Sequence, residues 1–150
     1  MIITSFADIE VMTGFPRDRY DASEFTRGFA ASEVVRDGNE LCLSFPTSHK
    51  LSDEMTIWFP LCGEMPSARL LELACDMCAD ITQLDNMVQD SCESEYRRND
   101  LGPENYELYL AYAEIEGDTV GLEYFGTRVN TQWNAKFKRS SAGHWLKLNF

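Results

Sequence analysis

The chain has 150 residues, a formal net charge of −12, 44% apolar residues and 12% aromatic residues. This size and composition are typical of one globular domain with a substantial core, and they exclude a disordered chain. An acidic surface repels phosphate, so we expect no direct nucleic-acid partner; a basic protein would be attracted instead. Solubility alone is the other explanation of the charge.

The N-terminus and the cysteines indicate a cytoplasmic protein. The first residues lack the basic and apolar regions of a signal peptide, and no stretch of about 18 apolar residues is present to span a membrane. The five cysteines are an odd number without the spacing of a disulfide framework. Free, buried thiols in a reducing compartment fit this pattern best.

The N-terminal part of the sequence predicts three strands and little helix. Residues 8–12 alternate and could form a strand, and residues 16–21 have the composition of a loop followed by a short helical turn. Residues 33–45 predict a hairpin, because Gly38 tolerates the positive φ of a tight turn and apolar side chains alternate after it. Residues 55–60 predict the next strand, apolar enough to be central.

The strongest periodicity predicts one long helix between residues 67 and 99. Apolar residues recur there at steps of three and four, at Leu70, Ala74, Met77, Ile81, Leu84, Val88 and Cys92. A helix of roughly 25 to 30 residues is about 40 Å long, so it needs an equally long apolar surface to cover it. A sheet supplies that surface. A coiled-coil dimer is the alternative, and it is less favoured because the flanking segments have strand patterns.

The last third of the sequence predicts a four-stranded meander over residues 106–116, 119–125, 131–139 and 144–150. In the first of these strands the alternation places Leu108, Leu110 and Tyr112 on one face. The predicted fold is therefore α+β. Three N-terminal strands and the four-stranded meander form an antiparallel sheet on one long central helix, in a single domain of residues 1–150.

Two patterns in the sequence are candidate signs of metal or catalytic chemistry. Cys75 and Cys78 have CxxC spacing, but they lie within the predicted helix, and zinc needs four ligands. His49 and His144 have no partner at the spacing of a catalytic motif, and no glycine-rich phosphate loop is present. We therefore expect a protein that is not an enzyme and has no metal or cofactor. A small enzyme or ligand-binding domain with a pocket under the helix is the alternative.

Charge is distributed unevenly along the chain. Between residues 80 and 123, twelve acidic residues stand against Arg97 and Arg98, a net charge of about −10. Residues 124–150 contain five basic residues and no acidic one. Cross-strand ion pairs, at about 0.2–1 kcal/mol each, explain part of this layout. The excess in residues 90–107 and 114–118 is larger than such pairs can absorb, so we expect a partner there.

The C-terminal third also carries a family resemblance. Segments 109–118, 122–126, 129–137 and 143–145 combine aromatic residues, turns and an Asn-Thr-x-Trp step. Over roughly residues 106–146 this pattern resembles small bacterial immunity proteins encoded beside polymorphic toxins, including those of contact-dependent growth inhibition systems. The resemblance implies a cytoplasmic, non-enzymatic monomer that forms a heterodimer with a basic toxin domain, with a nuclease the expected activity of that domain. It identifies no contact residues.

The charge layout supplies the expected contact residues instead. We expect the partner to bind an acidic cluster, with exposed tyrosines as anchors because interface cores favour aromatic residues. These residues are Asp90, Glu93, Glu95, Glu114, Glu116 and Asp118, with Tyr109 or Tyr112. A non-enzymatic adaptor or a homodimer built on the long helix is a further alternative.

Overall fold

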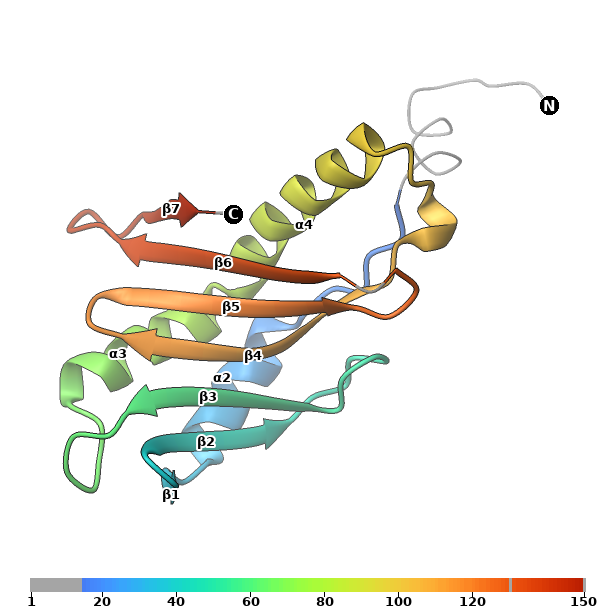
Figure 1. The fold of residues 1–150 in the computed structure, drawn as a ribbon. Coiled ribbons are helices and arrows are strands. Elements are labelled where there is room, and N and C mark those ends of the chain that lie inside the picture. The colour runs from blue at the N-terminus through green and yellow to red at the C-terminus, as the bar shows by residue number, and fades with distance from the viewer. Residues whose placement is uncertain (1–14, 130, 150) are drawn as a thin grey trace.

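A computed structural model describes residues 15–129 and 131–149, so the predicted strand at residues 8–12 lies outside the described part. The described residues form seven strands, three α-helices and a short 3-10 turn, and Figure 1 shows how they are arranged. In chain order they are α2 (Ala22–Ala31), β1 (Val35–Asp37), β2 (Glu40–Pro46), β3 (Glu54–Pro60), α3 (Ala68–Ala79), α4 (Ile81–Arg98), η1 (Pro103–Asn105), β4 (Leu108–Glu116), β5 (Thr119–Gly126), β6 (Gln132–Arg139) and β7 (Trp145–Asn149).

The seven strands form one sheet in the order β1-β2-β3-β4-β5-β6-β7. Neighbouring strands are antiparallel, with one exception: β3 and β4 are parallel, and Ile57 lies opposite Ala113. Parallel neighbours need a long crossover, and here α3 and α4 supply it. The α+β class is therefore confirmed for the described residues, with a sheet that is mostly antiparallel.

The prediction of one long helix is wrong, because the chain breaks between α3 and α4 at Asp80. Asp80 has φ −109° and ψ 16°, outside helical values. Its carboxylate accepts hydrogen bonds from Arg139 Nη1 and Trp145 Nε1, both at 2.8 Å. The sheet therefore holds this residue at the junction. α2 is also a full helix of ten residues, where the sequence indicated only a short turn.

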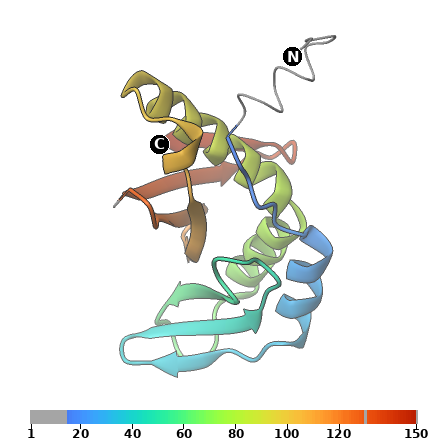
Figure 2. The same cartoon turned by 90° about the vertical axis from the view of Figure 1, so that its right-hand side faces the viewer.

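All three helices cover the same face of the sheet, as Figure 2 shows from the side. Alternating strand residues such as Leu41, Ile57 and Leu122 are buried against them. Apart from Leu70, which is partly buried, the apolar stripe of the predicted helix, including Leu84 and Val88, is fully buried in this layer. A coiled-coil dimer would need this stripe to be exposed, whereas the packing of the helices on the sheet already buries it. No helix of the described part is long and apolar enough to cross a membrane.

A polar network crosses the core between α4 and the sheet. The Asp85 carboxylate is buried, and it accepts hydrogen bonds from Tyr124 Oη at 2.6 Å and from Gln89 Nε2 at 3.3 Å. Gln89 Oε1 in turn accepts from the Tyr106 hydroxyl. Burial raises the pKa of Asp85, although both donors favour its ionised form. The network thus fixes α4 against β5 and against the segment that leads into β4.

Removing the Tyr124 hydroxyl tests this network. Tyr124→Phe leaves the buried Asp85 carboxylate with Gln89 alone, so we expect the free energy of unfolding to fall by about 1–3 kcal/mol. Urea denaturation at neutral pH measures the change. Tyr112→Phe, on the uncovered face, is the matched control. An equal loss in the two variants would show that the Tyr124–Asp85 bond contributes nothing specific.

Candidate functional site

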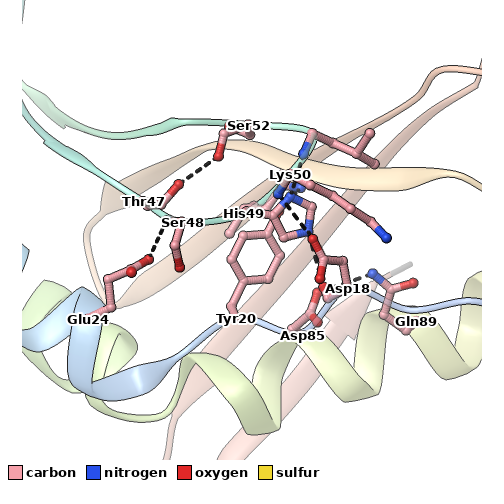
Figure 3. Close-up of polar contacts among 12 residues, drawn as sticks. Asp18, Tyr20, Glu24, Thr47, Ser48, His49, Lys50, Ser52, Asp85 and Gln89 are labelled. Carbon is pink, nitrogen blue, oxygen red and sulfur yellow. Dashed lines mark hydrogen bonds and ion pairs between the residues drawn. The ribbon is translucent and has the colours of Figure 1, made fainter.

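His49 is a buried residue at the junction of the N-terminal segment and the β2–β3 loop, and Figure 3 shows its ring over that of Tyr20. Its Nδ1 accepts from the Leu51 N–H at 3.2 Å, so the proton lies on Nε2. Nε2 lies 3.1 Å from the Asp18 carbonyl oxygen and 3.5 Å from the Asp18 carboxylate. The side chain is 1% exposed. Two engaged nitrogens without solvent access favour a structural role over acid–base catalysis.

The other residues considered for chemistry are dispersed. His144 is exposed and its backbone N–H donates to Ser140 Oγ. Cys78 is buried, which raises the pKa of its thiol to about 12, whereas Cys75 is exposed. Exposed Cys75 and Cys62 correct the expectation that all five thiols are buried. Within residues 15–129 and 131–149, no group of three or more His, Cys, Asp or Glu side chains could hold a metal ion.

The predicted acidic cluster is divided between two parts of the molecule. Asp90 and Glu93 lie on α4, and each accepts a hydrogen bond from the Arg17 guanidinium at 2.7 Å. Glu95 pairs with Arg98 one turn further along α4, at 2.8 Å. Figure 1 places this end of α4 and the β4–β5 turn at opposite ends of the molecule. The structure therefore does not bring the helix acids together with Glu114, Glu116 and Asp118.

Internal ion pairs account for more of the acidity than the sequence indicated. Arg17 lies outside residues 80–123, the acidic stretch of the sequence. It is nevertheless bonded to Asp90, which lies 73 positions further along the chain. Asp118, in the β4–β5 turn, pairs with Lys138 at 3.1 Å. Arg17 thus offsets half of the charge of Asp90 and Glu93, and Lys138 offsets that of Asp118. These residues are thus less available to a partner than their position in the sequence suggested.

Glu114, Glu116, Tyr109 and Tyr112 share the face of the sheet that none of the helices α2, α3 and α4 covers, called the uncovered face below. Residues three apart in a regular strand point to opposite faces, so Tyr109 and Tyr112 should be separated. A β-bulge between Leu110 and Tyr112 shifts the register and places both on the uncovered face. Ala113 and Ile115 occupy the core instead. The prediction that Tyr112 shares a face with Leu108 and Leu110 is therefore wrong.

Tyr20 stabilises this bulge from the core side. Its hydroxyl oxygen accepts a hydrogen bond from the Leu110 N–H at 2.7 Å. Backbone groups at a bulge leave the regular ladder and need other partners. Tyr20 comes from the N-terminal segment, 90 positions away. That segment therefore helps to determine which β4 side chains reach the uncovered face.

Carboxylates gather around Trp58 at one end of the uncovered face. A hollow of about 340 Å³ is lined there by residues that include Trp58, Glu40, Glu114 and Glu116. Within the described residues, none of these three glutamates has a cation within 4.0 Å. Partial burial, followed by the charges of Glu40, Glu123 and Glu116, raises the pKa of Glu114. The fold thus holds like charges together with no ion-pair partner among these residues, although the charge of Lys136 acts on the pKa of Glu114 in the opposite direction.

Glu123 extends this acidic region on the neighbouring strand. It lies opposite Tyr112 in the register of β4 and β5 and is only 7% exposed. The side-chain amides of Gln132 and Asn134 each donate to one of its carboxylate oxygens. These two amides on β6 fix the orientation of the carboxylate but do not neutralise it. The acidic half of the uncovered face therefore comprises Glu40, Glu114, Glu116 and Glu123, beside Trp58 and Tyr112.

Trp58, Glu40 and Glu123 were absent from the predicted site. The alternation in residues 54–60 was available as a signal that Trp58 faces away from Ile57 and Phe59. The parallel pairing that sets Trp58 opposite Glu114 depends on the crossover and had no local signal. Searches with this chain found no matching family model, no matching curated protein and no matching solved structure. The arrangement itself offers a hollowed, aromatic and acidic surface suited to cationic side chains.

The charge on Glu114 should reduce the stability of the protein. The pKa of Glu114 is raised in the folded protein. Above that pKa the side chain is ionised, and its charge costs more free energy in the folded state than in the unfolded chain. We expect Glu114→Gln to raise the free energy of unfolding at neutral pH. The gain should disappear as the pH falls through the pKa of Glu114, because the wild-type side chain then becomes neutral.

Urea denaturation across this pH range measures the effect. Glu95→Gln is the control, because it removes an equal charge from an exposed carboxylate that has its own arginine. A Glu114→Gln variant that is less stable than wild type at neutral pH would contradict the prediction.

Proposed function

We propose that this protein is an immunity-type inhibitor that binds a basic toxin domain through the acidic half of its uncovered sheet face. A nuclease is the expected activity of that domain. One observation carries the proposal: Glu40, Glu114 and Glu116 converge on Trp58 without a cation from the described residues within 4.0 Å. A partner that brings lysine or arginine side chains to this hollow would supply the missing charge.

A basic protein fits this surface for three physical reasons. The net charge of −12 attracts it over a long range and speeds the encounter. Trp58 and Tyr112 are half-buried aromatic residues in a region where a cation can contact both a ring and a carboxylate. Interfaces also favour Trp and Tyr as central anchors, whereas a phosphate backbone would be repelled.

The proposed contact residues differ from those expected from the sequence. Glu114, Glu116, Tyr109 and Tyr112 remain, because all four lie on the uncovered face. Asp90, Glu93, Glu95 and Asp118 form internal ion pairs away from the Trp58 hollow and are not part of the proposed centre. Trp58, Glu40 and Glu123 take their place.

Binding to the toxin domain encoded by the adjacent gene tests the proposal. We expect the two purified proteins to form a one-to-one complex whose association rate falls steeply as salt is raised. Glu116→Lys should weaken binding by about tenfold or more, because it reverses a charge at the centre of the contact. Isothermal titration calorimetry and stopped-flow kinetics provide the two measurements.

Glu95→Lys is the matched control, because it changes the net charge equally but lies on α4. Equal weakening by Glu116→Lys and Glu95→Lys would show that only the total charge matters. A wild-type protein that does not bind the adjacent toxin domain would remove the proposed function.

A further inference from the structure

Gly121 lies on the uncovered face, in the interior of β5 and opposite Glu114. The strand register places it in a row that crosses the sheet from β3 to β6: Trp58 is opposite Glu114, Glu114 is opposite Gly121, and Gly121 is opposite Lys136. Figure 1 shows these strands side by side in front of the helices. The row thus runs from an aromatic ring and an anion to bare backbone and then to a cation.

Nothing within the described protein requires glycine at this position. Gly38, Gly117 and Gly143 have φ values of +61°, +60° and +84°, which favour glycine, but Gly121 does not lie in that region. A Cβ at Gly121 would lie 3.7 Å from the Glu114 carbonyl oxygen and 4.0 Å from the Glu114 Cβ, which are ordinary contacts. At Gly28, by contrast, a Cβ would collide with the Phe45 ring.

A glycine in the middle of a strand weakens that strand, because it adds backbone entropy to the unfolded chain and gives no side chain to pack. Such a residue marks a bulge, a tight bend, or a site where another backbone or a ligand approaches closely, and the register of β4 and β5 is regular at Gly121. Glu114 and Lys136 lie on either side of Gly121, and their backbones are two strands and therefore about 10 Å apart. Between them the backbone at Gly121 carries no side chain.

We infer that a segment of the basic partner crosses the sheet at Gly121, with its main chain in contact with the glycine backbone. The inference rests on the proposed function and specifies how the partner sits. A cationic side chain of the segment points toward Glu114 and Trp58. A hydrogen-bond acceptor of the same segment points toward Lys136. The glycine is thus kept for docking, at the expense of strand stability.

Charge decides which molecule occupies the face. A second copy of this chain would also carry a net charge of −12, so stacking two acidic faces would be opposed by long-range repulsion. A basic domain is attracted over the same distance. Lys136 limits the acidic region on the β6 side, so the basic surface of the partner should end near that strand.

Adding side chains at Gly121 tests the inference through two quantities that should change in opposite directions. We expect Gly121→Ala and Gly121→Val to raise the melting temperature, because each reduces the entropy of the unfolded chain and valine also suits a strand. We expect the affinity for the toxin domain of the adjacent gene to fall, by about tenfold for valine and by less for alanine. Gly143→Ala, at a positive φ in the β6–β7 turn, should instead lower the melting temperature and leave the affinity unchanged.

Each contrary result has a distinct meaning. A lower melting temperature for Gly121→Ala would show that the glycine serves the fold, and unchanged affinity in Gly121→Val would show that no partner backbone approaches it. Either result would overturn the inference while wild-type binding survives. Absent wild-type binding would remove the proposed function and this inference together. A wild-type homodimer in sedimentation that Gly121→Val disrupts would assign the face to a second copy, and would also overturn it.

Discussion

The parallel pairing of β3 and β4 determines how the rest of the protein is arranged. Two parallel neighbours cannot be joined by a tight turn, so the chain leaves the sheet and crosses it through α3 and α4 before returning. α2 packs on the same side (Figure 2), and one face of the sheet becomes the dry interior. None of the three described helices packs on the opposite face. An uncovered surface of half-buried aromatic side chains and unbalanced carboxylates is the direct consequence.

Long-range polar contacts then determine which side chains that surface presents. Tyr20 accepts the Leu110 N–H at the bulge, and the bulge turns Tyr112, Glu114 and Glu116 away from the core. His49 and Asp18 hold the segment that carries Tyr20. Contacts of this kind stabilise the fold, whereas the gathered glutamates weaken it. A cluster of like charges that lowers stability is expected at a functional surface rather than in a part of the protein that serves the fold alone.

The sequence predicted the strands well because their signals are local. Alternation and turn residues such as Gly38 and Gly117 placed every described strand within a few residues of its observed position. The break at Asp80 was not predictable from periodicity, because the apolar stripe continues in phase on both sides. Its cause is Arg139 and Trp145, which lie 59 and 65 positions away. The candidate site was predicted only in part, for the same reason. Glu114 and Glu116 belong to a local run of acidic residues that the sequence shows. Trp58 lies beside them only because the crossover pairs β3 with β4.

Solvent accessibility of the aromatic side chains gives the most direct test of the claim that the uncovered face is the docking surface. Hydroxyl-radical footprinting would compare the free protein with its complex with the proposed basic partner. We predict protection of Trp58, Tyr109 and Tyr112, with no change at Trp133 and Tyr96, which pack on the helical side. Protection of the α4 side with unchanged labelling of Trp58 and Tyr112 would contradict the account.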